Sequence, residues 1–363
     1  MMKQYKKIGV LTGGGDCPGL NAVIRAVVKT AMANNIEVIG IHNGYNGLVN
    51  NEMVTMRDHH VAGILARGGT ILGTTNRDNP FHFCVTENGQ RQFVDKSLQA
   101  MKNLKDREIE ALVVIGGDGT IKVASDLIPL GATVVAVPKT IDNDIPGTER
   151  TFGFDTAVHV ATEALDRLRT TAESHHRVMI LEVMGRYAGW IALHSGIAGG
   201  ADGILIPEIP YQLDAVVNKI KKRIRQGKLF SLLVVAEGAK PVGGEVTVAR
   251  IVENSFEKIR LGGVGVKIAR QIEDITGIES RCTVLGHVQR GGTPTSYDRV
   301  LATRYGVAAV NALINGCTAD MVALQRNEII TVPIDVVANK PSNISLDNKL
   351  LQAAALTGVC LGQ

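Results

Sequence analysis

Three short segments of this sequence combine glycine with polar side chains in a way that suits phosphate chemistry. The first, residues 12–21, reads Thr-Gly-Gly-Gly-Asp-Cys-Pro-Gly-Leu-Asn and lies between an apolar run and a helical pattern. Glycines let backbone N–H groups approach an anion, and a helix N-terminus adds partial positive charge. The spacing is neither G-x-G-x-x-G nor G-x-x-x-x-G-K, so the standard dinucleotide and P-loop sites do not apply. The segment predicts another kind of phosphate site; a tight strand-to-helix turn is the alternative.

The second segment, residues 115–120, reads Ile-Gly-Gly-Asp-Gly-Thr and also follows an apolar run. Asp118 lies among glycines whose amides suit phosphate oxygens, and its carboxylate suits Mg²⁺, which takes oxygen ligands. Two loops of this type in one chain indicate a polyphosphate ligand. A plain turn is the alternative for this loop.

The third segment, residues 138–145, places Asp142 and Asp144 two positions apart, so both project to one side if the chain is extended. One carboxylate could take the proton of an attacking hydroxyl while the other stays near a metal ion. That arrangement suits phosphoryl transfer to an alcohol. An Asp-rich turn without chemistry is the alternative.

Cationic residues flank other apolar runs. Arg177 precedes the run at residues 178–183 and Arg186 follows it, whereas Arg281 precedes a polar segment, residues 285–292, that contains Arg290. Arginine binds phosphate with two parallel hydrogen bonds, so these positions suit a phosphorylated ligand. Taken singly, each arginine is better explained as a surface or salt-bridge residue.

The elements that would position these segments are visible as short runs of Val, Ile and Leu. These runs are predicted strands and lie at residues 8–11, 37–41, 111–115, 133–137, 178–183 and 232–236. Continuous apolar runs indicate strands buried on both faces, hence an α/β fold with a largely parallel sheet between helices. Ligands of such sheets bind beyond the carboxyl ends of the strands, where the polar clusters lie.

Helical spacing of apolar residues appears at 20–32 and again from about Asp155, and we place a domain boundary just before the second pattern. Near the C-terminus, residues 328–337 are predicted to form a strand and residues 346–355 a helix. No motif accounts for the part of the chain after about Ala319.

Bulk composition narrows the classes of protein. The chain has 363 residues, 45% hydrophobic and 20% charged, with a formal net charge of +4 and 40 glycines. These values exclude global disorder and give little support for nucleic-acid binding. The five cysteines form no Cys-x-x-Cys pair, and no run of about 18 apolar residues could span a membrane. We expect a soluble cytoplasmic protein with neither zinc nor structural disulfides.

Taken together, the motifs resemble those of 6-phosphofructokinases of the bacterial type. The resemblance rests on residues 13–21, 116–120 and 138–144, on Met184-Gly185-Arg186, and on residues 285–292, Leu-Gly-His-Val-Gln-Arg-Gly-Gly. These segments cover most of the chain in order. Thr-Ile-Asp-Asn-Asp and Leu-Gly-His-x-Gln-Arg-Gly-Gly are highly specific, whereas Gly-Gly-Asp-Gly-Thr also occurs in NAD and diacylglycerol kinases.

The resemblance implies two α/β domains with the active site in the cleft between them. It assigns residues 1–153 and about 289–340 to a phosphoryl-donor domain, and residues 154–288 and about 341–363 to a sugar-phosphate domain. The implied reaction is the glycolytic transfer of a phosphoryl group from Mg²⁺–ATP to the 1-hydroxyl of fructose 6-phosphate. The family works as a homotetramer that is often allosteric. Arg25 and Arg169 match basic positions of its effector site, although Lys29 stands where the family has Arg; salt bridges are the alternative.

The resemblance also implies a role for each residue that stands at a matching position of a family motif. Asp142 would be the general base, Asp118 would hold Mg²⁺ with Asp144 nearby, and Arg186 and Thr140 would stabilise the transferring group. The donor would be lined by Gly15, Arg77, Asp118, Gly119 and Thr120. The sugar phosphate would be held by Thr140, Asp142, Met184, Gly185, Arg186, Glu237, His287 and Arg290. Arg177 and Arg281 would reach it from a neighbouring subunit.

Residues 119 and 139 bear on which phosphoryl donor, ATP or pyrophosphate, the protein uses. Pyrophosphate-dependent members resemble this chain at Lys139 but carry Asp where Gly119 stands; most ATP-dependent members have Gly at both. The mixed pair favours ATP, since Asp at position 119 would clash with the α-phosphate in size and charge. Pyrophosphate dependence is the main alternative. More distant ones are an NAD or lipid kinase with the same glycine loop, and a non-catalytic sensor of nucleotides or sugar phosphates.

Overall fold

A computed structural model of the protein describes residues 4–87, 89–251, 259–338 and 341–363. The chain divides into two compact units. Unit 1 comprises Met1–Ile141, Ile145–Gly153 and Arg290–Lys340, and unit 2 comprises Asp142–Asp144, Phe154–Gln289 and Pro341–Gln363. Three of the points at which the chain passes between units fall inside the predicted site segments: on either side of Asp142–Asp144, and between Gln289 and Arg290.

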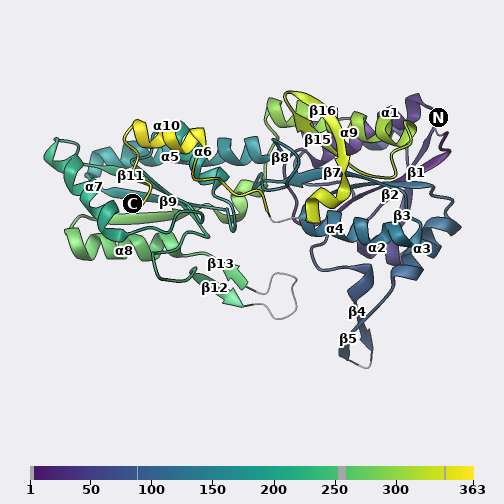
Figure 1. The fold of residues 1–363 in the computed structure, drawn as a ribbon, viewed down its shortest axis with the longest axis horizontal. Helices are drawn as coiled ribbons and strands as arrows, with labels where there is room; N and C mark the ends of the chain where they lie inside the picture. The colour runs from purple at the N-terminus through teal and green to yellow at the C-terminus, as the bar shows by residue number, and fades with distance from the viewer. Residues whose placement is uncertain (1–3, 88, 252–258, 339–340) are drawn as a thin grey trace. The chain divides into compact units, whose positions relative to one another are not determined.

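Unit 1 is built on a mostly parallel sheet of strand order β16-β15-β7-β6-β1-β2-β3 (Figure 1). The edge strands β3 and β16 run antiparallel to their neighbours, and the short β8 pairs with β7. The strand bounds are β1 Lys7–Thr12, β2 Glu37–Ile41, β3 Met53–Met56, β6 Ala111–Gly116, β7 Val134–Thr140, β8 Phe152–Gly153, β15 Ala319–Gln325 and β16 Glu328–Pro333.

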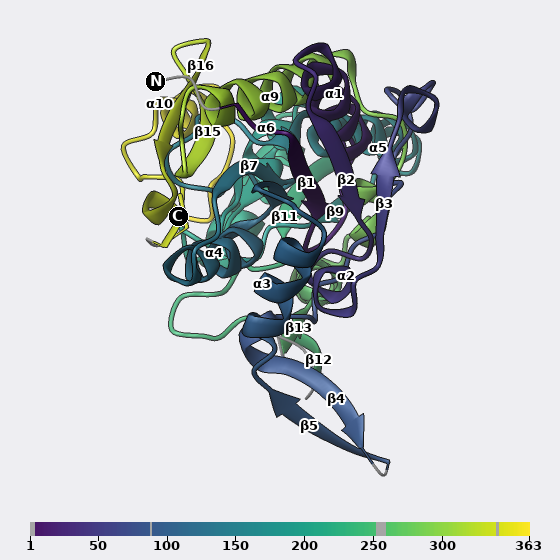
Figure 2. The ribbon, with the colours of Figure 1, turned by 90° about the vertical axis from the view of Figure 1, so that its right-hand side faces the viewer.

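Helices cover both faces of this sheet. Helices α1 (Leu20–Ala33) and α9 (Ser296–Ile314) pack together on one face (Figure 2). Helices α2 (Tyr45–Asn50), α3 (Ser97–Asp106) and α4 (Asp118–Leu127) lie on the other, and a hairpin of β4 (Phe83–Glu87) and β5 (Gln90–Val94) projects beyond them. The sheet is thus enclosed between helices, as its continuous apolar strands predict.

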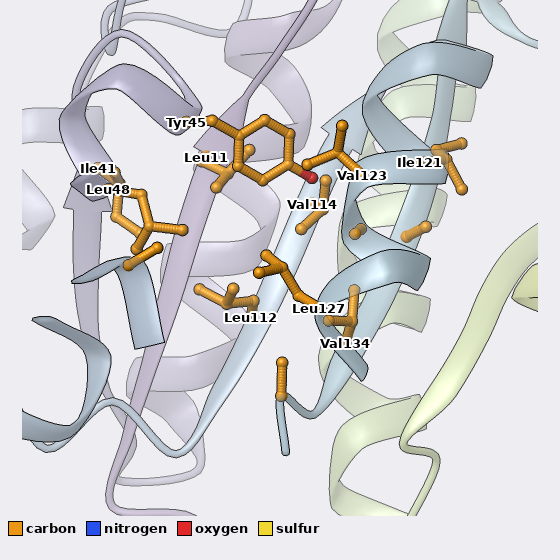
Figure 3. Packing of buried hydrophobic residues seen from close by; sticks show 14 of the residues in the cluster. Leu11, Ile41, Tyr45, Leu48, Leu112, Val114, Ile121, Val123, Leu127 and Val134 are labelled. Carbon is orange, nitrogen blue, oxygen red and sulfur yellow. The ribbon is translucent and has the colours of Figure 1, made fainter. Parts of the chain in front are cut away.

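The core of unit 1 lies where α4 packs on the sheet. Leu112 and Val114 of β6 and Val134 of β7 are buried against Ile121 and Leu127 of the helix (Figure 3). Each such side chain contributes about 1.5–3 kcal/mol when it is fully removed from water. This packing fixes the start of α4, and therefore Asp118, relative to the ends of the strands.

Unit 2 has a smaller, parallel sheet of order β10-β11-β9-β14. Helices α5 and α6 pack on one face, and α7 and α8 contribute to the apolar core on the other. The strand bounds are β9 Val178–Val183, β10 Gly203–Leu205, β11 Ser231–Ala236 and β14 Ser280–Val284, with an antiparallel pair β12 Val248–Ile251 and β13 Ile259–Leu261. The helix bounds are α5 Phe154–His175, α6 Trp190–Ala198, α7 Leu213–Arg225, α8 Val264–Thr276 and α10 Lys349–Leu356.

The predicted α/β class with largely parallel sheets is confirmed, whereas two predicted C-terminal elements were wrong in extent. The strand predicted at 328–337 ends at Pro333, which has no N–H to continue a ladder, and Ile334–Ala338 form a 3₁₀ turn. The helix predicted at 346–355 starts at Lys349, because the Asn348 side chain caps it by accepting from the Leu350 N–H.

The described part of the chain contains neither disulfide bonds nor helices that could span a membrane. Each of the five cysteines is a free thiol. Among the described residues, no helix combines the length and the apolar character that crossing a membrane requires.

Candidate active site

The first glycine segment forms a loop between β1 and α1, packed against the loop that follows β6. The Gly13 N–H donates to the Ile115 carbonyl at 2.9 Å. A Cβ added at Gly13 would lie 2.5 Å from Cγ2 of Thr120, and one at Gly116 would lie 2.3 Å from its Cβ. The two loops therefore meet over the buried Thr120 side chain, and only glycine permits that approach.

A further segment, residues 70–77, clamps the glycine loop from outside. The Gly14 N–H donates to the Thr75 carbonyl at 2.9 Å, and Thr74 Oγ1 donates to the Gly14 carbonyl at 2.7 Å. Gly14 has φ +78°, a backbone conformation that glycine adopts without strain. The clamp brings Arg77, exposed and two residues beyond Thr75, to the predicted donor side.

Asp118 and Gly119 open helix α4, and both are exposed. The first N–H groups of a helix lack intrahelical partners and attract anions. A Cβ built on Gly119 would have no atom within 4 Å, so open space faces this position. The predicted donor residues Gly15, Asp118, Gly119 and Thr120 thus lie on two adjoining loops of unit 1.

Lys139 extends from β7 to the first glycine loop. Its side chain is buried, at 4% exposure, and Nζ donates to the Gly15 carbonyl at 2.5 Å. Burial lowers the pKa of Lys139, while the charges of Asp16 and Asp118 act in the opposite direction. The lysine is thus fixed beneath the loop.

Arg290 belongs to unit 1 and contacts the same loop. Its Nη1 donates to the Asp16 carbonyl at 3.3 Å, and a Cβ on Gly15 would lie 2.7 Å from that nitrogen. Sequence reasoning grouped Arg290 with the sugar-phosphate residues, whereas the described contacts group it with the donor loop. Together with Lys139 it brings positive charge to a loop predicted to bind phosphate.

The carboxylate segment begins where β7 ends at Thr140, whose carbonyl accepts a hydrogen bond from Thr151 Oγ1 at 2.7 Å. Asn143 adopts φ +54°, a left-handed conformation that asparagine tolerates better than most residues. Asp142 and Asp144, which flank it, are partly buried and belong to unit 2.

The predicted sugar-phosphate residues of unit 2 gather at the carboxyl ends of β9 and β11. The Met184 N–H donates to Oε1 of the buried Gln289 at 2.8 Å. Gly185 has φ +135°, and its carbonyl accepts from the Gly238 N–H at 3.1 Å. The structure thus brings Met184, Gly185 and Arg186 together with Glu237, which precedes Gly238, and His287 is exposed on the 3₁₀ turn Gly286–Arg290.

Arg177 and Arg281 lie at the opposite, amino-terminal ends of β9 and β14. Both contact Glu279: Arg177 Nε lies 2.6 Å from Oε2, and Arg281 Nη2 lies 2.5 Å from Oε1. Strand β9 separates Arg177 from Met184 by about 20 Å at 3.3 Å per residue. The two arginines therefore cannot reach the same phosphate as the Met184 loop of their own chain.

Comparison with known proteins decides the family. The family model described as phosphofructokinase matches residues 7–313, most of the chain. This chain belongs to the phosphofructokinase family. Its fold and family motifs are therefore those of phosphofructokinases, as the resemblance of the sequence implies.

Named relatives of this phosphofructokinase differ in phosphoryl donor. The chain is 53% identical to ATP-dependent 6-phosphofructokinase 2 of Clostridium perfringens, over 99% of each chain. It is 51% identical to the pyrophosphate–fructose 6-phosphate 1-phosphotransferase of Amycolatopsis methanolica, over 90% of this chain and 93% of the relative. Overall identity therefore does not decide the donor.

Solved phosphofructokinases share the fold. The structure of Pichia pastoris phosphofructokinase in the T-state superposes with a TM-score of 0.79 at 32% identity. That alignment covers 99% of this chain but 37% of the Pichia chain, so this phosphofructokinase spans little more than a third of that relative's length.

Sequence reasoning missed the residues that hold the site's backbone. Thr74, Thr75 and Gln289 act through hydrogen bonds to main-chain atoms, which leave no spacing pattern in a sequence. The glycines at 68, 69 and 73 were the one available signal for the clamp, because they form a cluster beside Arg77.

The candidate effector residues of this phosphofructokinase have partners in the described structure. Lys29 forms an ion pair with Asp58, and Arg169 Nη2 donates to the Gly199 carbonyl at the end of α6 at 2.5 Å. The Lys29 contact is a salt bridge, as the alternative predicts, whereas the Arg169 contact is a hydrogen bond to a main-chain carbonyl. An effector role of Arg25 and Arg169 stays a prediction.

Proposed function

We propose that this protein is an ATP-dependent 6-phosphofructokinase, which transfers the γ-phosphoryl group of ATP to the 1-hydroxyl of fructose 6-phosphate and releases ADP. One observation carries the choice among phosphoryl donors. Gly119 opens helix α4 in exposed space, with no atom within 4 Å of an added Cβ. This leaves room for the remainder of a nucleotide beside the phosphate-binding amides and adds no negative charge there.

Unit 1 serves as the donor domain. The amides of the first turn of α4 bind phosphate oxygens beside the first glycine loop, and Lys139 and Arg290 contribute positive charge. Arg77 and Thr120 complete the donor side. Lys139 occurs in pyrophosphate-dependent members too, but here its ammonium is bound to the Gly15 carbonyl, which gives it a structural partner within the loop.

Asp118 fits the magnesium ion that such a reaction uses. Its carboxylate is exposed at the start of α4, and carboxylate oxygen is a preferred ligand of this hard cation. Among the described residues, no cluster of three or more His, Cys, Asp or Glu side chains could hold a metal ion, so donor phosphates would supply further ligands. When bound, Mg²⁺ neutralises phosphate charge.

Unit 2 serves as the sugar-phosphate domain. Asp142 accepts the proton of the 1-hydroxyl as it attacks, and Arg186 and Thr140 stabilise the charge that develops on the transferring group. Met184, Gly185, Glu237 and His287 orient the sugar. Arg290, the first residue of unit 1 after Gln289, also binds the sugar phosphate, and Asp144 stays close to the metal ion. Phosphoryl transfer depends mainly on such positioning and on charge neutralisation.

Arg177 and Arg281 serve the site of a neighbouring subunit. Their position at the amino-terminal ends of β9 and β14 separates them from the Met184 loop of their own chain, which supports a role across a subunit interface. This proposal requires a homo-oligomer, and a homotetramer is the form that the family resemblance favours. We infer that the protein works in the cytoplasm, because the proposed reaction is a step of glycolysis.

Replacing Asp142 with Asn tests the catalytic assignment. The amide keeps the shape of the carboxylate but cannot accept the proton, so turnover with ATP should fall by about 10²–10⁴-fold. Calorimetry should find fructose 6-phosphate binding largely unchanged. Near-normal turnover of the variant would show that Asp142 is not the base.

Pyrophosphate remains the second candidate donor because of Lys139 and the relative from Amycolatopsis methanolica. An NAD or lipid kinase is less consistent with the chain, because the family match extends over residues 7–313 and includes the sugar-phosphate motifs.

A further inference from the structure

The catalytic segment Asp142–Asp144 is held by a part of the chain for which the sequence offers no motif. The main-chain N–H of Ser342 donates to the Asp144 carbonyl at 2.7 Å. Ser342 lies at the start of the C-terminal segment of unit 2, nearly 200 residues from Asp144 along the chain. We call residues 341–345 the C-terminal strap.

The other side of the strap is attached to helix α6 and to a partly buried carboxylate. Trp190 Nε1 donates to the Ser342 carbonyl at 2.9 Å, and the Ile344 N–H donates to Glu208 Oε1 at 3.0 Å. Glu208 also accepts from the Gly189 N–H, at 3.0 and 3.1 Å from its two oxygens. The strap therefore has three hydrogen bonds that fix its backbone between two loops.

These contacts join the two sets of residues proposed to act on the transferring group. Gly189 and Trp190 directly follow the loop that carries Arg186, and Ser342 binds the segment that carries Asp142. The Asp142–Asp144 segment contains Asn143 in a left-handed conformation, which persists only where surrounding contacts impose it. The strap supplies one such contact.

We propose that the C-terminal strap positions the general base: through Ser342, Trp190 and Glu208, it fixes the Asp142–Asp144 backbone relative to the Arg186 loop. This inference rests on the proposed function, in which Asp142 is the base. The strap's contacts are with the Asp144 carbonyl, Trp190 and Glu208. Neither of these two side chains belongs to the residues proposed to bind substrate, so Trp190 and Glu208 are positioning residues. Misplacing a reacting group by about 1 Å can cost about 10²-fold in rate, so loosening the strap should lower kcat.

Four variants test whether the strap's hydrogen bonds affect turnover. Trp190→Phe keeps an aromatic ring and removes the Nε1 donor; Glu208→Met removes both acceptor oxygens, whereas Glu208→Gln keeps one oxygen that can accept from both amides. Lys219→Met is the control, because it removes a bond to the Gly358 carbonyl in the same C-terminal part of the chain, beyond α10. We expect about tenfold lower kcat in Trp190→Phe and Glu208→Met, with KM for ATP unchanged. Glu208→Gln and Lys219→Met should stay near the parent kcat.

A double-mutant cycle with Asp142→Asn separates positioning from general damage. If the strap acts through the base, adding Trp190→Phe to Asp142→Asn should lower kcat by less than twofold further. Losses that multiply, or unchanged kcat in both Trp190→Phe and Glu208→Met, would overturn the proposal. Near-normal turnover of Asp142→Asn alone would instead overturn the base assignment. This single variant therefore tests the base independently of the strap variants.

Discussion

Gly119 is the residue at which a small change has the most specific expected consequence. It lies in the first turn of α4, where a side chain would meet no protein atom within 4 Å. A carboxylate is also compatible with a helix N-terminus, whose partial charge is positive. A substitution here therefore alters what the protein can bind while leaving its own packing intact.

Gly119→Asp should strongly lower kcat/KM for ATP, because the carboxylate adds bulk and negative charge where the α-phosphate would lie. The melting temperature should stay close to that of the parent, since no packed atom is displaced. Gly119→Ala is the matched control and separates bulk from charge. Steady-state kinetics and thermal melts check this, and full ATP activity in Gly119→Asp would contradict the role of position 119.

At the residue scale, the sequence was enough to predict which residues carry the chemistry, but not which atoms they bind in the fold. The glycines, Asp118 and Asp142 stand in motifs whose composition carries their chemistry. Arg290 shows the limit: its motif predicts sugar-phosphate binding, which stays a prediction, but gives no sign of its hydrogen bond to the Asp16 carbonyl of the donor loop. Such a side chain-to-backbone bond depends on tertiary packing, which spacing along the chain does not encode.

At the scale of elements, the proposed site residues lie at strand ends and in the segments where the chain passes between the two units. The buried strands were predictable because continuous apolar runs suit a sheet covered on both faces. The strap was not, because its backbone hydrogen bonds place no demand on side-chain type. Glu208, which holds it, is a carboxylate taken out of water, and burial raises its pKa above the ordinary value.

This raised pKa predicts a pH-dependent stability difference between the parent and Glu208→Gln. A group whose pKa is higher in the folded state stabilises the fold fully below its unfolded pKa, near 4.5, and loses that contribution as pH rises through the folded value. Glutamine does not titrate, so Glu208→Gln should gain stability relative to the parent between about pH 4.5 and 7. Thermal melts across this range measure it; a pH-independent difference would contradict the burial of a charged Glu208.

At the scale of the whole molecule, the arginine pair at Glu279 bears on assembly. Because Arg177 and Arg281 lie at the amino-terminal ends of β9 and β14, away from the Met184 loop of their own chain, the proposed function requires sites that are shared between two subunits. The sequence already predicted that ligands bind at the carboxyl ends of the strands and that these two arginines serve a neighbour. The parallel pairing of β14 with β9, which places Arg281 beside the start of β9, comes only from the fold.

Shared sites predict complementation between two inactive variants. Asp142→Asn lacks the base, and Arg177→Ala lacks a phosphate ligand for the neighbour. Mixed subunits that reassemble should regain activity, up to about a quarter of the parent for random pairing across a two-fold interface, since one site in each mixed pair is intact. An assay of the reassembled mixture, with each variant alone as control, would refute shared sites if activity stayed at the level of the separate variants.

The central claim, that this phosphofructokinase uses ATP, is tested most directly by comparing donors in one coupled assay. Formation of fructose 1,6-bisphosphate from fructose 6-phosphate is measured with Mg²⁺–ATP and with Mg²⁺–pyrophosphate at matched concentrations. The open position at Gly119 predicts rapid turnover with ATP and little with pyrophosphate. Efficient phosphorylation driven by pyrophosphate, with ATP inactive, would contradict it.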